Sequence, residues 1–310
     1  MCYNENMKEV EFKHHAKLVN NSKEKDLFEK HKDYILEVTN EFLSGYDFSA
    51  NLTIRVEDIS NDTEFVNGEV SDAFSGVTKY GHVIGLSSML LRATECDQGL
   101  RLCASLFHEL AHVYDHHHIL KSPYCKFNPM NLSHKTIDDL VFACGYHFWT
   151  EYFAYYKTYW LFDEEKEKYP TFLKIVNAYK SLKERHAEID KYVWTDRKRV
   201  ARKCAGFIKD VEAFIYSLSK YMAGNANKRK SYQYCDKTKN MKEFGEVETI
   251  VQRLYAKVAP IFTNTYGRGM TNKIGWLGNS IIVNVYQKFN ICPVQGKKRA
   301  HYVLYPGEEE

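Results

Sequence analysis

The chain has 310 residues, 44% of them hydrophobic and 27% charged, proportions of a folded protein with one large domain or two modest ones. Its 43 basic and 40 acidic residues leave a net charge of +3, so a nucleic-acid partner is not expected from bulk charge. The most apolar stretches are too short to span a bilayer, and no membrane partner is expected.

The start of the chain, Met1 to His15, is polar and has no apolar signal core, so nothing in it predicts secretion. The eight cysteines contain no C-x-x-C pair, and several occupy apolar helix positions. Reduced and mostly buried thiols are the simplest account, and they predict a cytoplasmic protein.

The first half of the chain mixes helix and strand signals. Residues 1–22 are predicted to be a polar arm, and a helical apolar period follows over residues 23–44. Alternation then predicts a strand at 52–56 and a hairpin over 76–88. Thr94 with Asp97, and Thr136 with Asp139, resemble capping boxes that open two further helices, the second of which runs to about residue 162. A loop is expected at 119–131.

The second half reads mostly as helices, at about 171–186, 188–222 and 240–262. The last segment, 274–289, fits either a strand or a helix. We therefore expect an α+β protein with three parts: a polar arm (1–22), a domain over 23–165 and a helical region over 166–310.

The most informative motif is His108-Glu109-Leu110-Ala111-His112, an H-E-x-x-H inside an apolar helical run. Residues four apart share one face of a helix, so His108 and His112 can offer two imidazole nitrogens to one Zn²⁺. Glu109 lies beside them and is the candidate general base. Both histidines fall roughly opposite the apolar face formed by residues such as Leu102 and Leu106.

A zinc ion held by two histidines needs a third protein ligand, and two candidates compete. Glu151 lies in the apolar stripe of the helix that starts near Thr136, where a carboxylate without a cation would be costly. His118 is the alternative, because the spacing of His108, His112 and His118 matches H-E-x-x-H-x-x-G-x-x-H. In that pattern a glycine breaks the helix, and Asp115 stands in its place here.

These residues give the chain a resemblance to the zincin metallopeptidases of the gluzincin type, and in particular to the ImmA/IrrE group of bacterial and phage enzymes. The segments that carry it are His82–Ser88, His108–His112 and Glu151–Ala154. It covers roughly residues 23–162, and it departs at Tyr155, where thermolysin-like enzymes have an aspartate. The resemblance implies a small antiparallel or mixed sheet packed on the H-E-x-x-H helix, followed by a mostly helical C-terminal half.

The resemblance also implies zinc-dependent hydrolysis of a peptide bond in a protein or peptide substrate. Zinc would acidify a water and Glu109 would accept its proton. The strand containing Val83, Ile84, Gly85 and Leu86 would lie along the cleft as an edge that pairs with the substrate.

Two other readings remain open. The chain could be a zinc-binding hydrolase of another bond, or a helical interaction protein in which the motif is incidental. In the latter, the basic clusters Arg197-Lys198-Arg199 and Lys228-Arg229-Lys230 could contact nucleic acid, although solvated helix faces explain them more simply. Substrate identity and oligomeric state are beyond the sequence.

Overall fold

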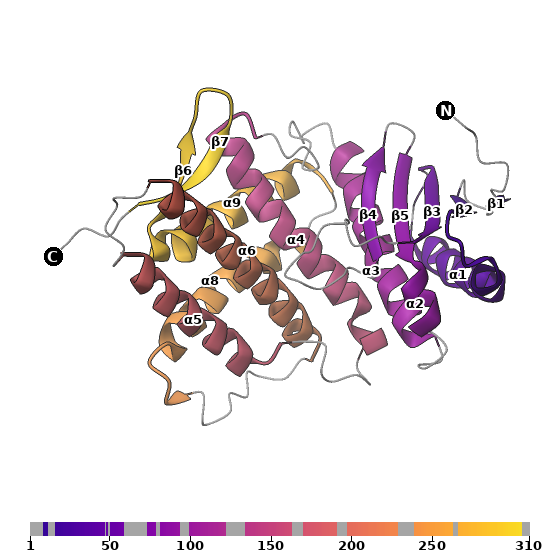
Figure 1. The fold of residues 1–310 in the computed structure, drawn as a ribbon, viewed down its shortest axis with the longest axis horizontal. Coiled ribbons are helices and arrows are strands. Elements are labelled where there is room, and N and C mark those ends of the chain that lie inside the picture. Colours follow the sequence, from indigo (N-terminus) through magenta and orange to yellow (C-terminus); the bar gives the residue numbers. More distant parts are fainter. Residues whose placement is uncertain are drawn as a thin grey trace. The chain divides into compact units, whose positions relative to one another are not determined.

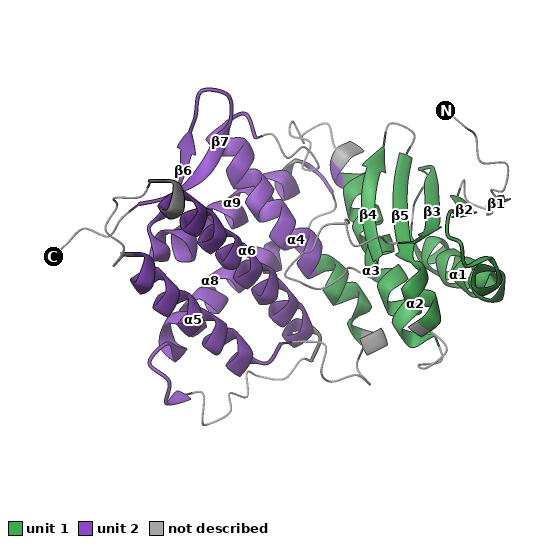
Figure 2. Cartoon of the chain, in the orientation of Figure 1, with its two compact units in different colours: residues 1–118, 153–165 green, residues 119–152, 166–310 purple. Residues whose placement is uncertain are grey.

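The computed structural model describes residues 9–11, 16–46, 48, 50–58, 73–78, 81–93, 99–121, 134–162, 170–190, 197–228, 239–262 and 266–305. These residues form an α+β structure with a small mixed sheet, as the sequence predicts (Figure 1). Contacts divide the chain into two compact units, Met1–His118 with Phe153–Glu165 and Ile119–Tyr152 with Lys166–Glu310 (Figure 2). Residues 119–152 thus cluster with the helical part. No described helix is long and apolar enough to cross a bilayer.

The first unit contains a five-stranded sheet in the order β1-β2-β3-β5-β4. The central strands β2, β3 and β5 are parallel, and the outer strands β1 and β4 pair antiparallel with their neighbours. The strands are β1 (Glu9–Glu11), β2 (Ala16–Asn20), β3 (Leu52–Glu57), β4 (Ala73–Thr78) and β5 (Gly81–Ser87). The predicted strand at 52–56 and the predicted hairpin, β4 with β5, are confirmed.

The predicted polar arm over residues 1–22 is wrong for its described part, because β1 and β2 both belong to the sheet. Ala16 and Leu18 of β2 are buried against the core while Lys17 between them is exposed. β2 is short and lies among charged residues, so its hydrophobic alternation is too brief to be recognised from the sequence. Its parallel pairing with β3 decides its structure, and that pairing is not visible locally.

Three helices lie wholly or mostly in the first unit: α1 (Lys25–Gly45), α2 (Ser88–Ala93) and α3 (Leu100–Lys121), the last of which continues three residues past the boundary at His118. The helix predicted over 23–44 is α1, and its apolar period buries Phe28, Ile35 and Phe42. It packs against β2 and α2. The capping box expected at Thr94 and Asp97, before α3, lies outside the described residues.

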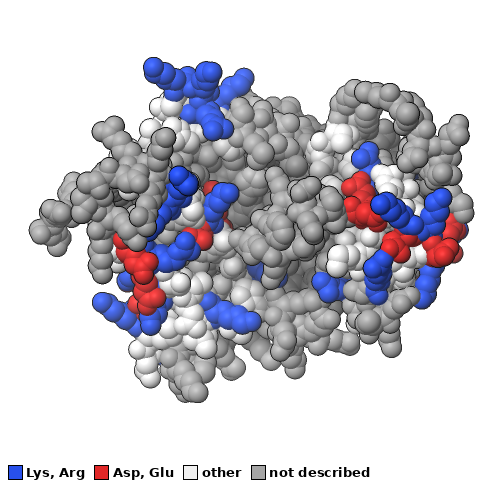
Figure 3. Space-filling model, in the orientation of Figure 1, with Lys and Arg blue, Asp and Glu red and all other residues white. Residues whose placement is uncertain are grey.

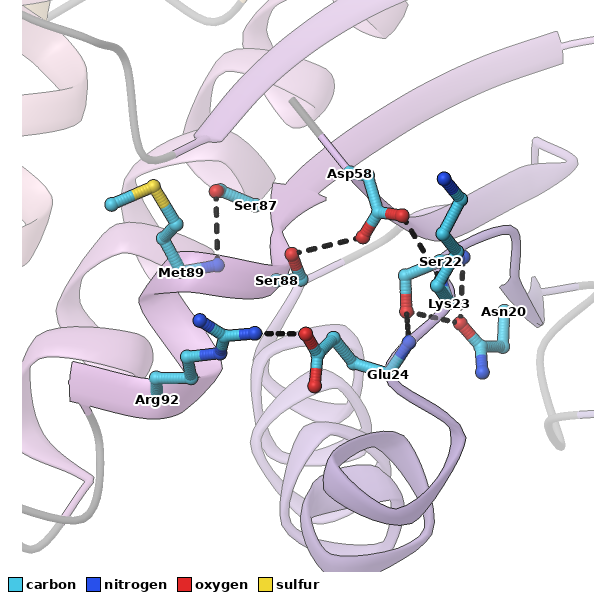
Figure 4. Close-up of polar contacts among 9 residues, drawn as sticks. All are labelled: Asn20, Ser22, Lys23, Glu24, Asp58, Ser87, Ser88, Met89 and Arg92. Atoms are coloured by element: carbon cyan, nitrogen blue, oxygen red, sulfur yellow. Dashed lines mark hydrogen bonds and ion pairs between the residues drawn. The ribbon is translucent and has the colours of Figure 1, made fainter. Parts of the chain in front are cut away.

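A polar network closes the carboxyl ends of the three parallel strands (Figure 4). The Asp58 carboxylate, just after β3, accepts hydrogen bonds from the Lys23 backbone N–H at 3.0 Å and from the Ser88 hydroxyl at 3.1 Å. Glu24 forms an ion pair with Arg92 of α2. The starts of α1 and α2 are therefore tied to the end of the strand that lies between β2 and β5.

The second unit is helical apart from one hairpin. The Thr136–Asp139 capping box is confirmed: the Asp139 N–H donates to the Thr136 hydroxyl at 3.1 Å, and the Thr136 N–H donates to the Asp139 carboxylate at 2.9 Å. The remaining elements are α4 (Ile137–Phe162), α5 (Phe172–Asp190), α6 (Arg197–Lys228), α8 (Phe244–Phe262), α9 (Arg268–Asn284), η1 (Tyr286–Phe289), β6 (Ile291–Gln295) and β7 (Ala300–Leu304). The ambiguous segment 274–289 is helical, and the β6–β7 hairpin that follows it was not predicted.

Helices α4 and α9 cross at two glycines. A methyl group on Gly278 would meet the carbonyl oxygen of Val141 and the backbone N of Gly145, and one on Gly145 would meet the carbonyl oxygen of Ile274. Two backbones approach this closely only where neither carries a side chain. The crossing fixes the N-terminal half of α4 within the second unit.

Candidate metal site

The H-E-x-x-H motif lies in the middle of α3, which is helical over Leu100–Lys121. Leu102, Leu106 and Leu110 are buried, as the predicted apolar face requires. The opposite face is covered as well, because His112 is 6% exposed and Asp115 is 0% exposed. On this face His112 is buried, whereas His108 is only partly buried.

The imidazoles of His108 and His112 converge on one point. Their Nε2 atoms are 3.0 Å apart, and the ring planes are nearly perpendicular at 87°. Two nitrogens that each lie about 2.0–2.1 Å from a tetrahedral zinc ion are roughly 3.3 Å apart. The i,i+4 spacing on an unbroken helix thus places the two nitrogens at nearly the separation that one shared ion requires.

Glu151 joins this pair from α4. Ligand atoms of His108, His112 and Glu151 lie within 4.8 Å of one another, and this is the one such His/Cys/Asp/Glu group among the described residues. The boundary between the two units falls inside α4, directly after Tyr152. Glu151 therefore lies within the continuous helix α4, and the turn that follows it belongs to the first unit.

That next turn of α4 is anchored to the first unit by aromatic contacts. The Tyr155 ring packs on the His108 ring with centroids 4.5 Å apart, and the Phe153 ring stacks with Tyr114 of α3 at 6.3 Å. The Lys157 ammonium lies 5.3 Å from the centroid of Tyr46, which follows α1. Tyr155 thus supports the candidate ligand His108 by ring packing.

Glu109, the predicted general base, is 9% exposed. On an α-helix it lies about 100° round from His108 and about 60° from His112. Its carboxylate is not part of the three-residue ligand group. The position of Glu109 on the neighbouring flank of the helix is the one that a proton acceptor beside a metal-bound water requires.

The alternative third ligand, His118, is not part of the group that His108, His112 and Glu151 form. The helix α3 continues without a break through Asp115 to residue 121, so His118 does not swing back toward the motif. Six residues on a continuous helix place it about 240° from His112, and its ring instead packs on Tyr114 with centroids 4.4 Å apart. Asp115 adopts the left-handed conformation less readily than glycine would, so the helix does not break at this position.

The neighbouring His116 and His117 are buried, because each of these residues is 5% exposed. The His117 ring lies 4.9 Å from Phe48 and 5.5 Å from His82 of β5, centroid to centroid. The sequence signal that the helix continues is Ile119, one turn beyond Asp115 and 1% exposed.

The predicted substrate-binding edge at Val83, Ile84, Gly85 and Leu86 is wrong, because β5 is an interior strand. Both of its sides are paired, with β3 and with β4, so its backbone groups are engaged. Ile84 and Leu86 are fully buried. Gly85 has a packing role instead, since a side chain there would meet the ring of Phe74 on β4.

Comparisons of the chain with protein-family models, with curated proteins and with solved structures find no match. The functional argument therefore rests on the chemistry and spacing of the residues themselves.

Proposed function

We propose that this chain is a zinc-dependent metallopeptidase. The observation that carries the proposal is the convergence of His108, His112 and Glu151 within 4.8 Å, because these are three ligands of the kinds that catalytic zinc takes. Zinc itself is part of the proposal. It is the metal that two histidines and one carboxylate hold in hydrolases that keep a fourth position open for water.

The donor set fits such an ion. Two neutral imidazoles and one carboxylate give a bound divalent cation one compensating negative charge, while a closed structural zinc site more often uses thiolates. Glu151 is half-buried in an otherwise apolar stretch of α4 whose neighbours Thr150 and Tyr152 are buried. A carboxylate in such surroundings is stabilised by a cation.

Bound zinc polarises a substrate carbonyl and lowers the pKa of a coordinated water. In this proposal Glu109 accepts the proton of the attacking water and passes it to the nitrogen of the leaving amine. The burial of Glu109 keeps its carboxylate away from competing bulk water. Tyr155 holds the His108 ring in the orientation that directs its Nε2 toward that of His112.

The proposed substrate is an extended segment of a protein. In the order β1-β2-β3-β5-β4, β4 is an outer strand of the described sheet, whereas β5 is interior. Two large apolar side chains of β4 are exposed, Phe74 at 40% and Val77 at 36%. An outer strand that presents exposed apolar side chains is a surface against which an extended peptide packs.

The proposal is tested with the zinc-loaded full chain on an unstructured protein such as casein, followed by mass spectrometry of the products. Glu109→Gln preserves shape but cannot accept a proton, so the cleavage rate should fall by about two orders of magnitude or more while metal content is unchanged. His118→Ala is the matched control and should cleave at the wild-type rate. Cleavage by Glu109→Gln at the wild-type rate, or no cleavage by the zinc-loaded wild type, would refute the proposal.

A further inference from the structure

The β6–β7 hairpin of the second unit carries a compact group of cations at its tip. Its turn is Gly296-Lys297-Lys298-Arg299, and all three cations are exposed. A fourth cation, Lys135, lies 160 residues before Gln295 in the chain. The side-chain amide of Gln295 donates a 3.0 Å hydrogen bond to the Lys135 carbonyl oxygen and so brings this residue alongside the turn. We call Lys135, Lys297, Lys298 and Arg299 the basic tip.

The backbone of the basic tip is held in place. The Gly296 N–H donates to the Arg299 carbonyl at 3.1 Å and closes the turn. The Ala300 N–H donates to the His134 carbonyl at 2.8 Å, which fixes the segment before α4 against the start of β7. The four charged side chains therefore project from an ordered ribbon, and a ligand that binds them needs to order only the side chains themselves.

The basic tip has no compensating ion pair within the described part of the chain. None of its four side chains forms an ion pair with a described residue, in contrast to Lys183, Arg185 and Arg92 elsewhere in the chain. Two carboxylates follow Lys135 in the first turn of α4, Asp138 and Asp139, and Asp139 accepts a hydrogen bond from the Thr136 backbone N–H. Figure 3 shows Lys and Arg atoms gathered at the upper left, where Figure 1 places the end of the hairpin, with no Asp or Glu atoms coloured among them.

We propose that the basic tip binds double-stranded DNA through its phosphate backbone. Two paired strands lie about 4.8 Å apart, so the ribbon with its side chains fits a major groove about 12 Å wide. An anionic membrane is a poorer match, because the turn from Gly296 to Arg299 carries no apolar side chain to insert between lipids. Four cations neutralise up to four phosphates, and this contact does not depend on base sequence.

The proposal is independent of the metal site, since no residue of the basic tip is among His108, His112 and Glu151. It also differs from the expectation, drawn from net charge, that the protein has no nucleic-acid partner. The net charge of +3 is the balance of 43 basic and 40 acidic residues over the whole chain, and it does not show where charges gather locally.

The test is fluorescence anisotropy of a labelled random-sequence DNA duplex of about 20 base pairs, titrated with the full chain at several salt concentrations. With four phosphate contacts, the slope of log K against log salt is about −3.6, and affinity falls about 150-fold between 50 and 200 mM salt. The triple variant Lys297→Gln, Lys298→Gln, Arg299→Gln should bind more than about tenfold more weakly at 50 mM salt, with a slope near −1.

A charge-matched control separates the basic tip from the general charge of the protein. Lys174→Gln, Lys242→Gln, Lys257→Gln removes three exposed cations on other parts of the second unit and should leave the slope unchanged. Circular dichroism and the thermal midpoint check that both triple variants are folded.

Three results would overturn the proposal. One is an equal loss of affinity in both triple variants, or no duplex binding at 50 mM salt. A second is binding to phosphatidylserine vesicles or to polyglutamate that depends on the basic tip while the duplex does not bind. A third is RNA duplex binding as tight as DNA binding, because the narrow major groove of A-form RNA does not admit the ribbon.

Discussion

Replacing Gly278 by alanine should destabilise the protein, although the same change in a helix interior usually stabilises it. Alanine exceeds glycine by about 1 kcal/mol in helix propensity. At Gly278, however, the new methyl carbon would lie 2.9 Å from the backbone N of Gly145 and nearer still to the carbonyl oxygen of Val141. Both obstacles are backbone atoms of α4, which cannot rotate away.

The size of the effect follows from how far the helices must separate. Ordinary van der Waals contact for a Cβ atom begins at 3.4 Å, so the Gly145 contact alone requires a shift of about 0.5 Å (3.4 − 2.9), and the Val141 carbonyl requires more. Overpacking of this kind costs about 1–3 kcal/mol, and a backbone clash belongs at or above the upper end. After the propensity gain, we expect a net loss of about 2 kcal/mol.

The control is Gly275→Ala on the same helix, because a methyl group there meets nothing within 4 Å. It should stabilise by up to about 1 kcal/mol, so the two variants should differ by about 3 kcal/mol in urea unfolding followed by circular dichroism. If Gly278→Ala were as stable as Gly275→Ala, the close crossing of α4 and α9 would be refuted.

Three further substitutions test the fold around the proposed site. Ile84→Pro should cost about 3 kcal/mol or more of stability, because β5 is paired on both sides and proline removes a donor; an unchanged urea midpoint would contradict the interior position of β5. Thr136→Ala should cost about 1 kcal/mol through the lost cap of α4, and a urea midpoint equal to that of wild type would remove the cap from the account. Burial acts to raise the pKa of Glu246, but hydrogen bonds from Lys183 and Tyr179, each 2.8 Å long, outweigh it and hold the pKa below its ordinary value of 4.5. The stability that ionised Glu246 contributes is therefore present above pH 4.5 and lost as pH falls below it, so the stability difference between wild type and Glu246→Gln should shrink on acidification; a constant difference from pH 7 to pH 3 would contradict this.

The long periodic helices and the local hairpin could be predicted from the sequence because their signals are local. The apolar period of α1, the Thr136–Asp139 cap and the alternation of β3 each depend on residues within one element. The meeting of His108 with His112 is local in the same way, because helix geometry alone brings positions i and i+4 together.

The features that could not be predicted depend on long-range pairing. β2 is a strand because β3 lies beside it, and β5 is interior because β3 and β4 pair with it on either side. Strand alternation shows which face is buried but not how many neighbours a strand has. The basic tip was missed for the same reason, since Lys135 joins it only through the folded hairpin.

The choice of Glu151 over His118 depended on one local question, whether α3 breaks at Asp115. The sequence left both ligands open, because aspartate tolerates the left-handed conformation better than most residues but less well than glycine. In the structure Asp115 is helical and fully buried, and Glu151 joins the two histidines.

The most direct test of the central claim is elemental analysis of the purified full chain and of two variants, Glu151→Ala and His118→Ala. Wild type and His118→Ala should each retain about one equivalent of zinc after dialysis against a weak chelator, and Glu151→Ala should lose it, because three protein ligands are needed to hold the ion. Wild type without metal, or zinc retained by Glu151→Ala and lost from His118→Ala, would contradict the site proposed for this chain.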